Sequence, residues 1–125
     1  ALKNPGRYQS VSAFAPIVNP TQCPWGKKAF IGYLGEDSAT WKEWDATYLV
    51  EHATESITEH LPLFIDQGEA DNFLVEQLKP EALEAACEKT GYPITLRRQP
   101  GYDHSYFFIA SFIDEHLEFH SKALS

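Results

Sequence analysis

Three short apolar segments, separated by longer stretches of helical spacing, predict alternating strands and helices. Residues 8–15 combine β-forming and small side chains and stop at Pro16, while residues 61–66 and 93–97 are short apolar runs with glycine or proline at their borders. Apolar runs without strict alternation are typical of strands that are buried on both faces of a sheet. The pattern therefore predicts three buried strands.

Apolar residues at helical spacing fill the stretches between and after these strands. We expect helices at about residues 27–34, 45–52, 72–89 and 106–124. In the second, Trp44 or Asp45 is the first residue, and Asp45 is a plausible N-cap. In the third, Pro80 can begin a further helix that Gly91 closes. The last helix is expected to bury one face that carries Phe108, Ile109, Phe112, Ile113, Leu117 and Phe119 or His120.

This order of elements predicts an α/β fold with a parallel sheet, because strands that alternate with helices are joined by crossover connections. Three parallel strands alone would leave an unpaired edge and apolar surface in water. Residues 1–3 look like the last turn of a helix that residues 4–6 stop. We therefore expect residues 1–125 to be one structural unit with an incomplete sheet, whose remainder lies upstream of Ala1.

Composition and charge narrow the choice of partners. A chain of 125 residues with 43% hydrophobic content can bury a real core. The net charge of −8, with only 10 lysines and arginines, offers no basic face for nucleic acid. No segment approaches the roughly 20 apolar residues that a membrane helix needs, and no signal peptide pattern opens the chain. We expect a cytoplasmic protein that binds neither membranes nor nucleic acid.

Two polar residues follow strands where open parallel sheets collect active groups, just beyond the carboxyl ends. Asp71 comes shortly after the strand that ends near Asp66, and His104 after the strand that ends near Arg97. An acid after one strand and a histidine after the next is the order found in α/β-hydrolases, whose nucleophile comes first in the chain. A neutral histidine can take a hydroxyl proton, and a carboxylate on its other nitrogen fixes the tautomer. The order predicts an acid–base pair.

Spacing alone leaves other roles open for these residues. Asp71 could simply cap the following helix, Asp66 could be the acid instead, and His104 could cap the last helix. Asp103 is the least favoured orienting acid, because neighbours in a turn usually point apart.

Metal and thiol chemistry are less favoured. His116 and His120 stand four apart, as zinc ligands can, but no His-Glu-x-x-His motif surrounds them and a solvated helix face is the favoured interpretation. Cys23 and Cys87 match no metal spacing, and both are expected to be free thiols. Cys87 has the spacing of a buried helix residue, while Cys23 lies in a turn-rich stretch with no base near it in sequence.

Four segments resemble the S-formylglutathione hydrolase (esterase D) family. They are NPGRYQSVSAFAP at residues 4–16, NPTQCPWGKKAF at 19–30, LFIDQGEADNFL at 63–74 and GYDHSYFFI at 101–109, in the family's order. The resemblance implies the C-terminal part of a single α/β-hydrolase domain, with Asp71 as catalytic acid and His104 as base. It also implies hydrolysis of the thioester S-formylglutathione to formate and glutathione, within formaldehyde detoxification, with side activity on small acyl esters and no cofactor.

The departure from the family is the missing nucleophile. The Gly-x-Ser-x-Gly elbow and the loop that supplies an oxyanion-hole amide should precede Ala1, and Ser10, Ser12 and Ser105 do not lie in such an elbow. Triad and oxyanion hole act as a unit, so we expect the isolated chain to be inactive. The expected partners are the substrate and the N-terminal part of the same domain. A second copy of the enzyme, in a homodimer, is a further candidate partner. The alternatives are an esterase for other small esters and a non-catalytic, hydrolase-derived interaction fragment.

Overall fold

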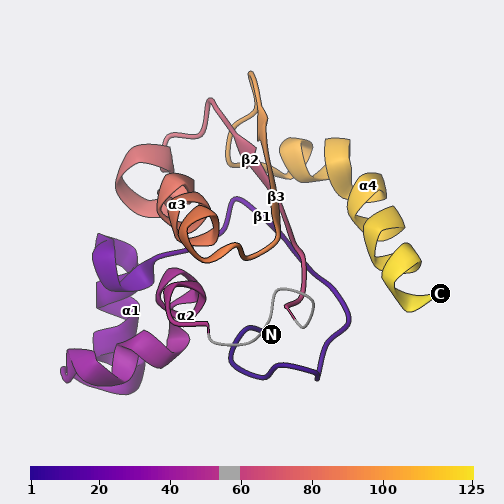
Figure 1. Cartoon of the computed structure of the whole chain (residues 1–125). Helices are drawn as coiled ribbons and strands as arrows, with labels where there is room; N and C mark the ends of the chain where they lie inside the picture. Colours follow the sequence, from indigo (N-terminus) through magenta and orange to yellow (C-terminus); the bar gives the residue numbers. More distant parts are fainter. Residues whose placement is uncertain (54–59) are drawn as a thin grey trace.

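The computed structural model describes residues 1–53 and 60–125. They form a parallel three-stranded sheet with helices packed around it (Figure 1). The strands are β1 (Val11–Phe14), β2 (Leu63–Gly68) and β3 (Ile94–Gln99), in the order β1-β2-β3. The expected α/β fold with parallel strands is confirmed.

The central strand β2 sets the register of the sheet. Ile65 pairs with Ala13 of β1 and with Leu96 of β3. All residues of β2 are buried, because strands flank both its edges and helices cover both its faces. β1 is shorter than expected at both ends, whereas β2 and β3 continue beyond the expected ends to Gly68 and Gln99.

Helices cover the two faces of the sheet unequally (Figure 1). One face carries α1 (Pro24–Leu34), α2 (Ala46–Glu51) and α3 (Pro80–Thr90), and the other carries α4 (Tyr106–Leu124). Shorter helical segments are η1 (Pro20–Gln22), η2 (Ser38–Trp44) and the π-helical turn η4 (Leu74–Leu78). The core beneath α2 and α3 comprises Val18, Val50, Leu63, Ile65, Leu83, Ala86, Cys87 and Tyr92.

Two helix starts show how the sequence determines the caps. The expected N-cap of α2 is confirmed, since the Asp45 carboxylate accepts a hydrogen bond of 3.0 Å from the Tyr48 N–H. The first helix begins earlier than expected, at Pro24. The Cys23 sulfur caps this helix by accepting a hydrogen bond from the Gly26 N–H.

The second helix expected between residues 72 and 89 does begin at Pro80, but the part before it forms only a π-helical turn. The π-helical turn η4 ends at Leu78 and is followed by Lys79, whose φ of 44° lies in the left-handed region, and α3 then begins at Pro80. A continuous helix cannot run through this point, because proline lacks an N–H and disfavours the α conformation of the residue before it. Gly91, with φ of 74°, closes α3 as expected.

Residues 1–3 form a turn. The Asn4 N–H donates to the Ala1 carbonyl over 2.9 Å, and Gly6 adopts φ of 82° as the chain turns toward β1. No helix is assigned at residues 1–3, and the expectation of a helix end here stays a prediction.

The buried face of α4 also differs from the expected one. Phe108 is buried as expected, but Ile113 and Leu117 are 36% and 60% exposed, while His116 is only 2% exposed. The reason is a polar partner in the sheet, because His116 bonds to a buried carboxylate of β2 and stacks on Phe14.

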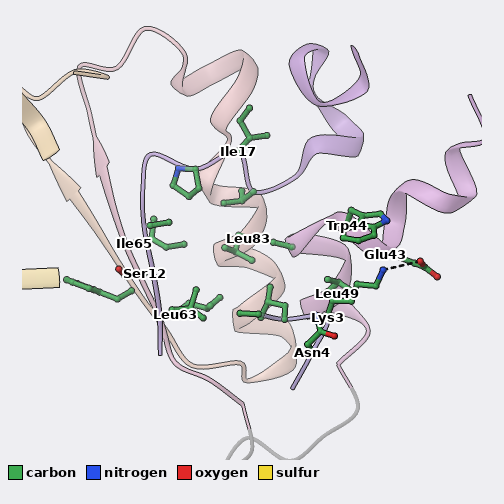
Figure 2. Close-up of a pocket in the computed structure, with 18 residues that line it drawn as sticks. Lys3, Asn4, Ser12, Ile17, Glu43, Trp44, Leu49, Leu63, Ile65 and Leu83 are labelled. Atoms are coloured by element: carbon green, nitrogen blue, oxygen red, sulfur yellow. Dashed lines mark hydrogen bonds and ion pairs between the residues drawn. The ribbon is translucent and has the colours of Figure 1, made fainter. Parts of the chain in front are cut away.

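An apolar cavity of about 330 Å³ lies between the sheet and the helices α2 and α3. Leu63 and Ile65 of β2 and Leu83 of α3 line it, and Trp44 lies on its other side (Figure 2). This part of the face beside β1 is therefore not filled by side chains of the described chain.

Candidate active site

Asp71 and His104 meet beyond the carboxyl ends of β2 and β3. His104 Nδ1 and Asp71 Oδ2 are 2.8 Å apart. The Asp71 side chain is fully buried, whereas the His104 side chain is 40% exposed. A buried carboxylate at Nδ1 orients the imidazole and leaves Nε2 for proton exchange with a reacting group.

Asp71 accepts further hydrogen bonds that fix its carboxylate. Oδ1 accepts from the Phe73 N–H over 2.8 Å, and Oδ2 accepts from Gln67 Nε2 over 3.2 Å. The bond to Phe73 closes a turn before η4. The N-cap position of η4 is Phe73, which has no side-chain cap, so Asp71 does not occupy the cap position of the following helix. The same carboxylate can also bind His104, because Oδ1 accepts from Phe73 while Oδ2 faces His104.

The two loops that carry the acid and the base are held together by their backbones. The Glu69 N–H donates to the Gln99 carbonyl over 3.0 Å, and the Ala70 N–H donates to the Tyr102 carbonyl over 2.9 Å. At Gly68 a Cβ atom would lie 2.3 Å from the Tyr102 carbonyl oxygen. Only glycine allows this approach, which brings the loop that carries Asp71 against the loop that carries His104.

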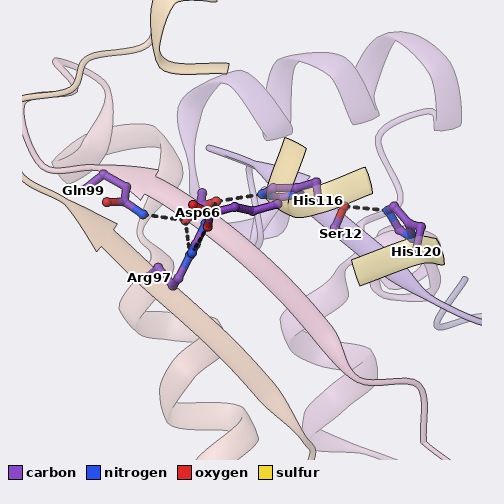
Figure 3. A network of polar contacts seen from close by, with 7 residues as sticks. Ser12, Asp66, Arg97, Gln99, His116 and His120 are labelled. Atoms are coloured by element: carbon purple, nitrogen blue, oxygen red, sulfur yellow. Dashed lines mark hydrogen bonds and ion pairs between the residues drawn. The ribbon is translucent and has the colours of Figure 1, made fainter. Parts of the chain in front are cut away.

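Asp66, the alternative acid, has a different set of partners (Figure 3). Its carboxylate accepts two hydrogen bonds from Arg97, at 2.8 and 2.7 Å, and one from Gln99 at 3.0 Å. His116 Nε2 lies 2.7 Å from its Oδ2. Burial would raise the pKa of Asp66, but the hydrogen bonds from Arg97, Gln99 and His116 outweigh burial and hold the pKa below its usual range. Asp66 therefore anchors helix α4 and does not contact His104.

The remaining alternatives for this site are not favoured by the structure. Asp103 is exposed. The N-cap position of α4 is occupied by Ser105, so His104 does not cap that helix.

The expected solvated face at His116 and His120 is wrong. His116 is buried against Asp66, and His120 lies 2.7 Å from Ser10 Oγ and 2.8 Å from Ser12 Oγ (Figure 3). A sequence signal for His116 did exist, because it lies two steps of four residues after Phe108 and so shares its helix face.

Gln67 is a site residue that sequence reasoning missed. Its side chain is buried, and its amide reaches the Asp71 carboxylate. No spacing rule indicates this contact, because it depends on the turn that carries Asp71 back over the end of β2.

Aromatic rings and a cavity adjoin His104. The Phe73 ring meets the imidazole edge to face, with centroids 5.3 Å apart, and Trp25 packs on Phe73 at 4.6 Å. Beside His104 lies a cavity of about 320 Å³, whose lining includes Phe14 and Ala15. The exposed edge of the imidazole thus faces space that a reacting group can enter.

Both cysteines are buried and free. The pKa of the Cys87 thiol is raised to about 11 by burial and, to a smaller extent, by the Glu84 carboxylate. Cys87 thus fits the expected buried helix position, and Cys23 serves as the cap of α1. Neither observation favours a catalytic thiol.

The described part of the chain has neither a candidate metal site nor a candidate membrane-spanning helix. No group of three or more His, Cys, Asp or Glu side chains is placed to hold a metal ion there. None of the described helices has the length and apolar character that crossing a membrane requires.

The fold and the strand-end acid and histidine define part of an α/β-hydrolase. More narrowly, the chain belongs to the Esterase family, whose model matches residues 1–119. It is 54% identical to an S-formylglutathione hydrolase of Rattus norvegicus over 126 aligned residues, covering 100% of this chain and 44% of the relative. A solved S-formylglutathione hydrolase from Agrobacterium tumefaciens superposes with a TM-score of 0.91 at 46% identity, covering 100% of this chain and 44% of that one. The chain thus spans less than half the length of these relatives.

Proposed function

We propose that this chain is the C-terminal part of a serine thioesterase that hydrolyses S-formylglutathione to formate and glutathione. The observation that carries the proposal is the 2.8 Å contact between Asp71 and His104 at the ends of adjacent parallel strands. The similarity to enzymes named S-formylglutathione hydrolase supplies the substrate. The nucleophilic serine and the oxyanion-hole amides belong, in this proposal, to the part of the relatives that this chain does not cover.

The two nitrogens of His104 have different roles in the reaction: Nε2 transfers the proton, and Nδ1 stays bonded to Asp71. Nε2 takes the proton of the serine hydroxyl as its oxygen attacks the formyl carbon, and the imidazolium is stabilised by Asp71 at Nδ1. The carbon–sulfur bond then breaks, and the sulfur receives the proton and leaves as glutathione. Next, His104 removes a proton from water, the hydroxide attacks the formyl ester, and formate leaves as the serine recovers its proton.

The cavity beside His104 is where we place the serine turn. It is lined by Phe14, Ala15 and the start of α4, and it adjoins the side of the imidazole that Asp71 does not occupy. Ala15 adopts φ of 46°, a left-handed conformation that non-glycine residues rarely adopt and that often occurs at functional sites.

The proposal is tested with the full-length protein. We expect His104→Ala to abolish turnover of S-formylglutathione, and Asp71→Asn to lower kcat by about 10⁴-fold, as a wrong histidine tautomer does in other triads. Asp103→Asn, next to His104 and exposed, is the matched control and should keep normal turnover. Ordinary turnover by His104→Ala would refute the assignment.

A carboxylesterase with another small ester as substrate is the second candidate. It is supported by the general character of the Esterase family, and the same acid and base would serve it. Rates of the full-length protein on S-formylglutathione and on a short carboxylic ester separate the two. A higher kcat/KM for the carboxylic ester would favour this candidate. The cytoplasmic location and a homodimer stay predictions from the sequence.

A further inference from the structure

Gln67 is the buried partner of the proposed catalytic acid. It is 1% exposed, and its Nε2 lies 3.2 Å from Asp71 Oδ2 and 3.1 Å from the carbonyl oxygen of Gly68. Both neighbours are acceptors, which identifies the atom between them as the amide nitrogen. Gln67 therefore donates to the same carboxylate oxygen that binds His104.

The carbonyl oxygen of the Gln67 side chain does not explain why a glutamine occupies this position. Gln67 Oε1 is buried and has no hydrogen-bond partner in the described part of the chain. A buried acceptor without a partner lowers stability, so an apolar side chain of similar size would suit the fold at least as well. The donor toward Asp71 is the function that remains.

We propose that Gln67 is a positioning residue that acts through Asp71; this rests on the function proposed above. Two constraints hold the Asp71 carboxylate, the Phe73 N–H on Oδ1 and the Gln67 amide on Oδ2. Together they fix its plane, so that Oδ2 points at His104 Nδ1 when the imidazolium forms. Without the amide the carboxylate is held from one side only, and its alignment with the imidazole loosens.

The test is Gln67→Met in the full-length enzyme, because methionine fills a similar volume without a donor. We expect kcat to fall about ten- to hundredfold, as for a lost hydrogen bond to a charged group, with KM nearly unchanged. Thermal unfolding should show equal or higher stability, since the unpaired oxygen is removed. Gln99→Met is the matched control. Its amide donates from β3 to Asp66 on β2, which does not contact His104, so kcat should stay normal.

A double-mutant cycle separates positioning from a structural role. In an Asp71→Asn background the carboxylate is gone, so Gln67→Met should have no further effect on kcat. An equal loss of kcat in both backgrounds, or a loss that accompanies a lowered unfolding temperature, would overturn the inference. A normal kcat for Gln67→Met would also overturn it.

The same cycle distinguishes failure of the proposed triad from failure of the role proposed for Gln67. If Asp71→Asn alone keeps normal turnover, the proposed triad is wrong. If Asp71→Asn is inactive while Gln67→Met is fully active, only the role of Gln67 fails.

Discussion

Gly68 shows at the scale of one residue why the two loops of the site can meet. A Cβ atom here would lie 2.3 Å from the oxygen and 2.7 Å from the carbon of the Tyr102 carbonyl. These are backbone atoms, and they cannot move aside as a flexible side chain would. The small size of glycine, and not an unusual backbone angle, is the property that the position requires.

Gly68→Ala should therefore separate the loop of Asp71 from the loop of His104. We expect the full-length enzyme to lose about 10²-fold in kcat, the scale expected for a displacement of about 1 Å within a site. The matched control is Gly32→Ala in helix α1, where an added Cβ meets nothing within 4 Å. That control should keep its activity, and normal kinetics for Gly68→Ala would show that the loops tolerate the separation.

The sequence predicted the contact between Asp71 and His104 but not the contact of Gln67 with Asp71, for a physical reason. Asp71 and His104 could be selected because parallel strands bring their carboxyl ends to one edge, which is a property of the topology. Gln67 could not, because its contact depends on how tightly the turn after β2 folds back. Spacing could not distinguish Asp66 from Asp71 either, since Asp66 ends and Asp71 shortly follows the same apolar run.

At the scale of elements, helix α4 is attached to the sheet by polar as well as apolar contacts (Figure 3). Asp66 of β2 bonds to His116 of α4 and to Arg97 of β3, and Arg97 in turn pairs with Glu115 of α4. Phe64 packs on the His116 ring at 4.4 Å. Because Asp66 is fully buried, its charge requires these donors.

Asp66→Asn should destabilise the attachment of α4 strongly. Asparagine replaces an acceptor by a donor that faces Arg97 and His116, and breaking a buried ion pair typically costs about 3–5 kcal/mol. The measurement is the free energy of unfolding of the full-length protein in urea. A change below about 1 kcal/mol would show that the network adds little to stability.

The pH dependence of unfolding provides a second measurement on the same variant. The pKa of Asp66 is lowered in the folded state, so its contribution is present above the unfolded value of about 3.9 and is lost as pH falls through the folded pKa. The unmodified protein should lose stability below about pH 4 more steeply than Asp66→Asn does. Parallel curves would contradict the role of Asp66 in this loss.

Elements were predicted well where local chemistry decides them. Asp45 and Gly91 cap helices as their side chains and backbone freedom dictate, and Pro80 starts α3. The π-helical turn before Lys79 and the buried His116 were missed. The turn depends on packing partners that lie far away in the sequence, so periodicity alone could not reveal it. His116 does share the helix face of the buried Phe108, but its polar partner Asp66 lies on another element, so a solvated histidine was expected.

At the scale of the whole molecule, the described chain leaves surfaces that a complete sheet would cover. Within residues 1–53 and 60–125, β1 and β3 each pair only with β2. The cavity beside β1 is lined mostly by apolar side chains (Figure 2). Ile113 and Leu117 on α4 are exposed. Unpaired strand edges and open apolar surface favour association with a further segment.

We therefore expect the 125-residue chain alone to be inactive and to bind a hydrophobic dye such as ANS. The proposed acid and base can transfer a proton, but without the proposed upstream nucleophilic serine and the oxyanion-hole amides the carbonyl has neither a positioned nucleophile nor a stabilised transition state. Hydrolysis of S-formylglutathione by the isolated chain should match that of buffer, and coexpression with the N-terminal part of the full-length protein should restore turnover and abolish dye binding.

Rapid hydrolysis by the isolated chain, lost on His104→Ala, would place the nucleophile within these residues. A folded, inactive monomer that binds no dye would instead favour a non-catalytic binding domain, because it would show that the chain covers its own apolar surface.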